Sequence, residues 1–211
     1  MLFILFKLEF FIFYKSFIVL IYIGDKILNK ININKSNILV FDLDGTLLNT
    51  DLANFLSYKQ ALFDKFKIIL PNATSRINAK SLNSFLSTPL NDLELSLVKH
   101  HKNAIYFNYI PQTSINKSLF DILLLYYKTN KTILLTNATK TRAMKLINFH
   151  NLKEYFDHIY FNSSGNKYRN LINFFKLNSD NLIVFEDDIE EIKNAKFTGI
   201  KQIYYIRSQN D

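Results

Sequence analysis

The sequence predicts an α/β fold in which a doubly wound parallel sheet carries an inserted helical domain. Short apolar runs rich in β-prone residues alternate with helical patterns along most of the chain, as a parallel sheet requires. Polar residues that suit ligand binding follow the ends of several of these runs. A long helical stretch separates the first run from the next one, and this stretch indicates an insertion.

The first predicted strand is Ile38–Phe41, a continuous apolar run that suits a sheet covered on both faces. Asp42 and Asp44 follow it, and the chain turns at Gly45. Because strand side chains alternate, both carboxylates start on the same side, at the carboxyl edge where open α/β sheets bind ligands. Paired acids need a cation, and Mg²⁺ prefers oxygen ligands. A calcium loop of the EF-hand type is excluded, because Thr46 stands where that loop needs an acidic or Asn ligand.

Residues 51–111 predict an all-helical insertion. The first helix starts with Asp51 as its cap and ends before a break at Pro71. A second helical pattern ends at Pro89, and a third starts near Asp92.

Helices and strands alternate after the insertion. Strands are predicted at 131–136, 159–161, 181–185 and 204–206, with helical faces between them at 119–126, 143–147, 171–175 and 192–196. The first of these strands ends at Thr136 and Asn137, and the third runs into Glu186 and Asp187. Because parallel strands joined by right-handed crossovers end at one edge, we expect Asp42, Thr136 and Asp187 to converge.

These strand ends resemble the motifs of the haloacid dehalogenase superfamily. The segment Asp42-Leu43-Asp44-Gly45-Thr46 is similar to the first motif, Thr136 to the second, and Glu186-Asp187 to the acidic pair of the fourth. Lys167, which opens a helical pattern, is the candidate for the third, although the usual Lys-Pro dipeptide is absent. The resemblance covers about 36–206 and is to the capped phosphatases, in a subgroup like the phosphoglycolate phosphatases. It implies a Rossmann-like core at 36–50 and 112–211, with 51–111 as the helical cap.

The resemblance implies phosphoryl transfer through an aspartyl phosphate. Asp42 would attack phosphorus. Asp44 would first protonate the leaving oxygen and then deprotonate the water that hydrolyses the intermediate. The Thr136 hydroxyl, the Asn137 backbone N–H and the Lys167 ammonium would hold the phosphoryl oxygens.

Mg²⁺ is the implied cofactor. It would bind through the Asp42 carboxylate, the Asp44 backbone carbonyl and Asp187, with Glu186 close by. Glu191 sits where a further acid orients the site in the family. Candidates for contacting the substrate are Thr46, Asn137, Arg76, Lys59 and Asn54.

The implied activity is that of a Mg²⁺-dependent phosphatase acting on a small phosphorylated metabolite. Two alternatives stay open at this point. One is a sugar phosphomutase of the same superfamily, and the other is a catalytically inactive domain that binds a partner or a membrane. A dehalogenase is disfavoured, because Asp44 would then have no acid–base task.

The composition narrows the function further. The 211-residue chain contains no cysteine, which excludes disulfides and a cysteine nucleophile. Its four glycines form neither a Walker loop nor a dinucleotide fingerprint. The net charge of +8 comes from lysines spread through a sequence also rich in Asn, Ile, Phe and Tyr, a pattern that an AT-rich coding sequence gives. We therefore expect no nucleic-acid partner, although the positive field favours a phosphorylated substrate.

Residues 1–35 lie outside the resemblance. The first 23 are almost all apolar or aromatic, and at this length they could span a membrane. Lys7, Glu9 and Lys15 oppose insertion, and no small-residue cleavage site follows. Two interpretations stand: a membrane anchor that leaves the enzyme on the cytosolic side, or a start codon assigned upstream of a soluble cytoplasmic enzyme. The charges favour the second.

Overall fold

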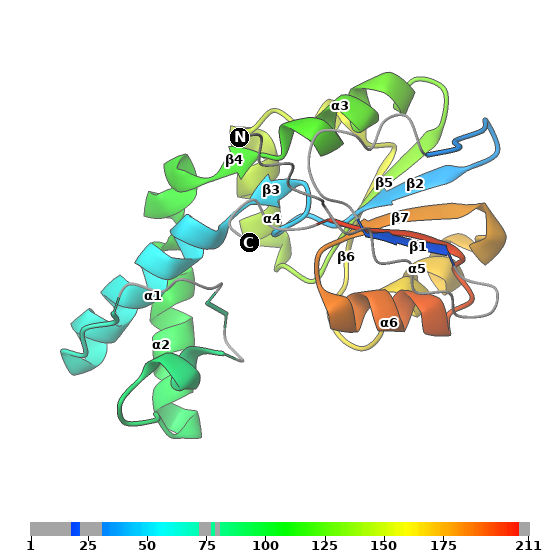
Figure 1. Ribbon diagram of the computed structural model, residues 1–211. Coiled ribbons are helices and arrows are strands. Elements are labelled where there is room, and N and C mark those ends of the chain that lie inside the picture. The colour runs from blue at the N-terminus through cyan, green and yellow to red at the C-terminus, as the bar shows by residue number, and fades with distance from the viewer. Residues whose placement is uncertain (1–17, 22–30, 72–76, 79–80, 207–211) are drawn as a thin grey trace, which may run out of the picture.

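The computed structural model of the chain describes residues 18–21, 31–71, 77–78 and 81–206 (Figure 1). Its centre is a six-stranded sheet in which every neighbouring pair of strands is parallel. The strand order is β1 (Ile18–Ile21), β8 (Gln202–Tyr205), β7 (Leu182–Glu186), β2 (Ile38–Phe41), β5 (Lys131–Thr136) and β6 (His158–Phe161). The predicted doubly wound α/β fold is confirmed, and β2 lies between β7 and β5.

Helices cover both faces of the sheet (Figure 1). One hydrophobic cluster joins Leu39 and Phe41 of β2 to α3 (Lys117–Tyr126) and α4 (Lys140–Phe149). A second cluster joins Val40 of the same strand to α5 (Lys167–Phe175) and α6 (Ile189–Phe197). Successive residues of β2 thus enter opposite cores, as the alternation of strand side chains dictates. All three are buried, which explains the continuous apolar run in the sequence.

The helical insertion has a hydrophobic cluster of its own. Helices α1 (Asp51–Phe66) and α2 (Asp92–Ile105) pack against each other and are followed by the 3-10 helix η2 (Tyr106–Gln112) (Figure 1). The cluster is built on Tyr58, Ala61, Leu62, Leu70, Leu82 and Val98. Two short strands, β3 (Leu48–Asn49) and β4 (Ser114–Ile115), pair antiparallel where the chain leaves and re-enters the larger part.

Two details of the insertion differ from the sequence prediction. The helical pattern expected before Pro89 is only a single 3-10 turn, η1 (Leu82–Phe85), in the part that the structure describes. The Asn83 side chain bonds both the N–H and the C=O of Leu90, and these bonds hold the following segment in a loop. At the start of α1 the cap residue is Thr50, and Asp51 is the first helical residue.

The amino-terminal region contributes a strand that the sequence analysis did not predict. β1 pairs in parallel with β8 at the edge of the sheet. Most of the apolar segment 1–23 lies outside the described residues, as do 24–30. Among the residues that are described, no helix is both long enough and apolar enough to span a membrane.

Candidate active site

The site begins where β2 ends. The Asp42 N–H continues the sheet by donating to the Phe185 carbonyl at 3.1 Å, so this carboxylate leaves the edge beside β7. The chain then folds back on itself, with the Leu47 N–H donating to the Asp42 carbonyl and the Gly45 N–H to Leu48. Gly45 has a φ of 89°, a conformation that side chains with a Cβ rarely adopt. This tight turn fixes the acidic segment at the carboxyl edge of the sheet.

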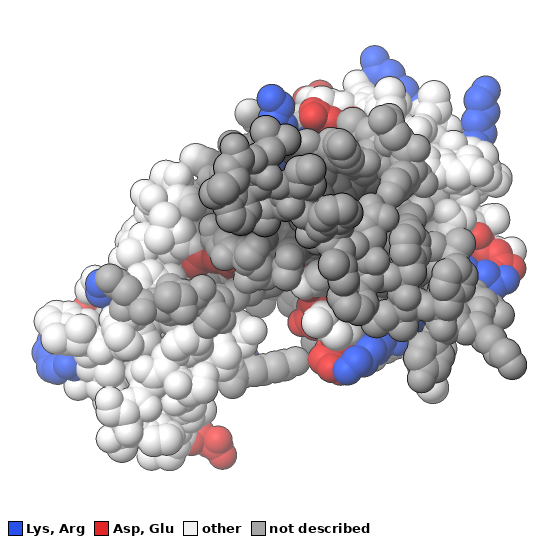
Figure 2. All heavy atoms as spheres, viewed as in Figure 1, with Lys and Arg blue, Asp and Glu red and all other residues white. Residues whose placement is uncertain are grey.

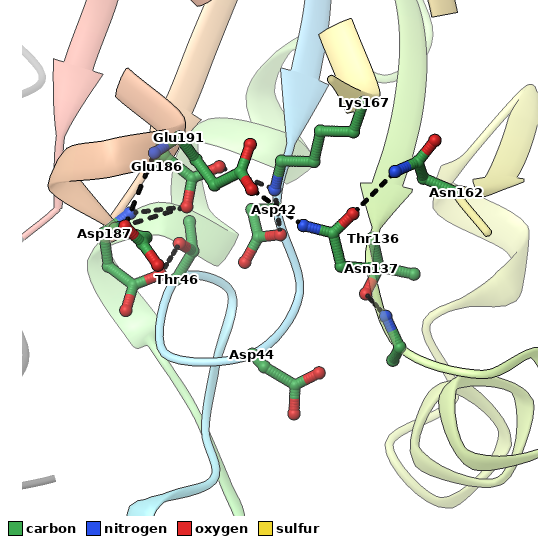
Figure 3. A network of polar contacts seen from close by, with 12 residues as sticks. Asp42, Asp44, Thr46, Thr136, Asn137, Asn162, Lys167, Glu186, Asp187 and Glu191 are labelled. Atoms are coloured by element: carbon green, nitrogen blue, oxygen red, sulfur yellow. Dashed lines mark hydrogen bonds and ion pairs between the residues drawn. The ribbon is translucent and has the colours of Figure 1, made fainter. Parts of the chain in front are cut away.

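A buried lysine lies between two carboxylates at this edge (Figure 3). Lys167 Nζ donates to Asp42 Oδ1 at 2.6 Å and lies 2.7 Å from Glu186 Oε2. Lys167 and Glu186 are each only 1% exposed. Asn166 caps α5 by accepting from two backbone N–H groups, which sets Lys167 at the first helical position, facing β2. The ammonium is therefore held by the helix start and by both acids.

Burial governs the ionisation of this group of residues. It raises the pKa of Asp42 well above its ordinary value; Glu186 raises it further and Lys167 lowers it. Burial alone would lower the pKa of Lys167, but the Asp42 and Glu186 carboxylates raise it above its ordinary value. Lys167 thus stays charged while the acids around it compete for one cation.

Three carboxylates converge at the same point. Asp42, Glu186 and Asp187 each offer an oxygen, and these oxygens lie within 4.8 Å of one another. The Thr46 hydroxyl donates to Asp187 Oδ1 at 2.8 Å, while Glu186 Oε1 accepts from two backbone N–H groups that follow it. Closely placed carboxylate oxygens are the donors that a hard divalent cation prefers. The set fits Mg²⁺, because Lys167 alone leaves it with surplus negative charge.

Thr136 and Asn137 lie at the end of the neighbouring strand β5. The Thr136 hydroxyl oxygen accepts from the Ala138 N–H at 3.0 Å. The Asn137 side chain donates to Glu191 at 3.0 Å and accepts from Asn162 at 2.9 Å (Figure 3). These bonds tie the end of β5 to Asn162, which follows β6, and to Glu191 in the first turn of α6.

Asp44 does not join the carboxylate group. Its side chain points away from Asp42, Glu186 and Asp187 (Figure 3). Instead its Oδ2 accepts from Arg142 Nη2 at 2.6 Å. Arg76 lies outside the described part of the chain. Asn54 is buried within the helical insertion, on α1, where its side-chain oxygen accepts from Lys102 on α2.

Sequence reasoning missed three residues of this region: Arg142, Lys102 and Tyr168. Tyr168 stands where the family motif carries proline, and its hydroxyl donates to Glu186 Oε2 at 2.5 Å. Arg142 carried a usable signal, since arginine occurs only four times in the chain and this one follows Thr136 by less than two helical turns. Lys102 carried none, because it is one of many lysines.

Comparison with known proteins defines the class. Residues 39–205 match the family model of the haloacid dehalogenase-like hydrolases. The chain belongs to this family. No curated protein is significantly similar to it in sequence.

Solved structures share the fold at low sequence identity. A haloacid dehalogenase-like hydrolase from Streptococcus pneumoniae is 18% identical with a TM-score of 0.67, covering 83% of this chain and 88% of its own. A predicted phosphoglycolate phosphatase from Haemophilus somnus is also 18% identical, with a TM-score of 0.66 and coverages of 85% and 93%. The hydrolase YfnB from Bacillus subtilis, bound to magnesium, is 18% identical with a TM-score of 0.58 and coverages of 82% and 95%.

Proposed function

We propose that this chain is a Mg²⁺-dependent phosphatase that hydrolyses a small phosphomonoester through an aspartyl phosphate on Asp42. The observation that carries the proposal is the convergence of Asp42, Lys167, Glu186 and Asp187 at the carboxyl end of β2 and β7. The family supports a hydrolase of the phosphatase type. The magnesium in the Bacillus subtilis structure supports the choice of cation.

In the first step a carboxylate oxygen of Asp42 forms a bond to phosphorus as the ester P–O bond breaks. Asp44 gives its proton to the departing alcohol oxygen. In the second step Asp44 takes a proton from water, whose oxygen bonds to phosphorus while the bond to Asp42 breaks. Inorganic phosphate leaves, and both acids return to their starting states.

The other residues of the site position charge for this transfer. Lys167 holds Asp42 in place and offers its remaining N–H to the phosphoryl oxygens, as do the Thr136 hydroxyl and the Asn137 backbone. Asp42, Asp187, Glu186 and the Asp44 carbonyl would hold Mg²⁺, which when bound would offset the charge of the carboxylates and of the phosphoryl oxygens. The helical insertion, 51–111, would act as the cap that closes over the site and excludes water.

Phosphate release from a panel of phosphomonoesters, with and without Mg²⁺, tests the proposal. We expect turnover that chelation abolishes, and a loss of at least about 10³-fold in kcat in Asp42→Asn, because the nucleophile is gone. Lys140→Ala, at the exposed start of α4, is a matched control that should keep wild-type turnover. If Asp42→Asn retained the wild-type rate, the mechanism would be wrong.

The same assay separates the two alternatives. A phosphomutase would return the phosphoryl group to its sugar product and leave no phosphate in solution. A catalytically inactive domain would give neither product on any member of the panel.

A further inference from the structure

A second group of charged residues lies on the insertion side of Asp44. We name Lys102, Arg142, Asn54 and Tyr106 the basic cluster. Lys102 Nζ donates to Asn54 Oδ1 at 2.9 Å and lies 4.4 Å from the centre of the Tyr106 ring. The Arg142 guanidinium lies 5.3 Å from the centre of the same ring. One aromatic side chain therefore contacts both cations, and it holds them in one small region beside Asp44.

Among the described residues, the basic cluster brings two cations, Lys102 and Arg142, beside one carboxylate, that of Asp44. Asp44 is paired with Arg142, and among the described residues no carboxylate forms an ion pair with Lys102, although Lys102 is only 4% exposed. Burying an ammonium without an anion is costly. Burial accordingly lowers the pKa of Lys102 to about 7, with Arg142 lowering it further and Asp44 raising it. A further anion placed here would remove that cost.

Lys102 is buried and therefore does not belong to a basic surface. On the face shown in Figure 2, the described Lys and Arg side chains lie apart from one another. Lys102, by contrast, contacts Asn54 and Tyr58 of α1 and Tyr106 of η2. A lysine that is buried and held by three other side chains indicates a specific role in this protein.

We propose that the basic cluster binds an anionic group on the leaving-group side of the substrate, and that this anion replaces Asp44 as the partner of Arg142. The inference rests on the proposed phosphatase function and names its substrate class: phosphomonoesters whose alcohol part carries a carboxylate or a second phosphate. In the structure, the Asp44 carboxylate occupies the position on Arg142 that this anion would take. Once Arg142 is occupied by substrate, this ion pair no longer holds Asp44, which then serves as acid and base beside Asp42. Substrates without the second anion leave Asp44 on Arg142, so selectivity acts on kcat as well as on KM.

Matched substrate pairs test the proposal in the presence of Mg²⁺. One pair is phosphoglycolate and ethyl phosphate, and the other is propane-1,3-diol bisphosphate and its monophosphate. The wild-type protein should prefer the anionic member of one pair by at least tenfold in kcat/KM, with part of the preference in kcat. The pair that shows the preference identifies the anion as carboxylate or phosphate.

Lys102→Met removes the ammonium and keeps the apolar stem, and it should lower that preference at least tenfold. Lys102→Gln, which can still bond Asn54, is the second variant and should do the same. Lys99→Met, an exposed lysine on the same helix, is the matched control and should keep the wild-type preference. No preference in the wild type, or an equal preference in Lys102→Met, would overturn the proposal.

Binding separates this inference from the proposed function. Titration calorimetry of Asp42→Asn with phosphoglycolate and with the bisphosphate, in the presence of Mg²⁺, measures the anion site without turnover. Adding Lys102→Met should weaken binding of the preferred ligand at least tenfold. Equal binding would refute the basic cluster as an anion site, whereas weakened binding in a protein whose wild type turns over nothing would refute the phosphatase and keep the site.

Discussion

The two sides of the site have opposite charge arrangements. On the side of the sheet, three carboxylates converge, and two of them, Asp42 and Glu186, contact one buried lysine, Lys167. On the side of the insertion, Arg142 is paired with the Asp44 carboxylate, while Lys102 donates to the neutral Asn54 side chain. The first arrangement suits a divalent cation, and the second suits an anion. A phosphomonoester with a second anionic group would suit both arrangements. Its phosphoryl group would bind together with Mg²⁺, and the anion on its leaving group would offset the charge of Lys102 and Arg142.

Lys167→Met, on the carboxylate side of the site, should cause the largest loss of stability. The substitution leaves Asp42 and Glu186 facing each other without their buried cation, and breaking a buried pair costs about 3–5 kcal/mol. Chemical denaturation in chelator should show that loss in the free energy of unfolding. Mg²⁺ should recover more stability in the variant than in the wild type, because it binds a more negative site. Equal recovery in both proteins would mean that the three carboxylates do not hold the ion.

Tyr168→Phe, also on the carboxylate side of the site, should cause a smaller loss of stability. The variant loses one buried hydrogen bond to a carboxylate, worth about 1.5–3 kcal/mol, while Lys167 still contacts Glu186. Thermal or chemical unfolding measures the change. Because Glu186 would then be less firmly held, the Mg²⁺ concentration needed for half-maximal activity should rise. Tyr160→Phe, which removes a hydroxyl from β6 away from the carboxylates, is the matched control and should leave that concentration unchanged.

Part of this site could be predicted from the sequence and part could not. Asp42 and Asp187 follow apolar strands, and the rule that parallel strands end at one edge is enough to bring them together. The contact of Arg142 with Asp44 joins residues 98 positions apart, and that of Lys102 with Asn54 joins residues 48 apart. The first contact depends on how α4 packs beside the loop after β2, and the second on how α1 and α2 of the insertion pack against each other. Periodicity predicts the existence of helices but does not set that packing.

The pH dependence of stability tests the insertion side of the site, through Lys102. The pKa of Lys102 is about 7 in the folded chain and 10.5 as its reference value, so between these values the unfolded chain binds a proton that the native chain does not. The free energy of unfolding should therefore rise with pH above about 7, by about 1 kcal/mol per pH unit for this group. Lys102→Met should remove this rise. Denaturation of both proteins between pH 7 and 8 checks it, and identical slopes would mean that burial does not lower the pKa of Lys102.

The smallest effect is expected from an exposed ion pair close to the carboxylates. Lys193 and Glu190 on α6 are paired at 2.6 Å, but their side chains are 64% and 67% exposed. Water screens such a pair, so Lys193→Ala should change the free energy of unfolding by less than about 0.5 kcal/mol. The Mg²⁺ requirement should stay as in the wild type. Lys193 differs from Lys167 mainly in its exposure to solvent. A larger change in the free energy of unfolding would therefore show that long-range charge, rather than burial, determines how much such a lysine contributes to the site.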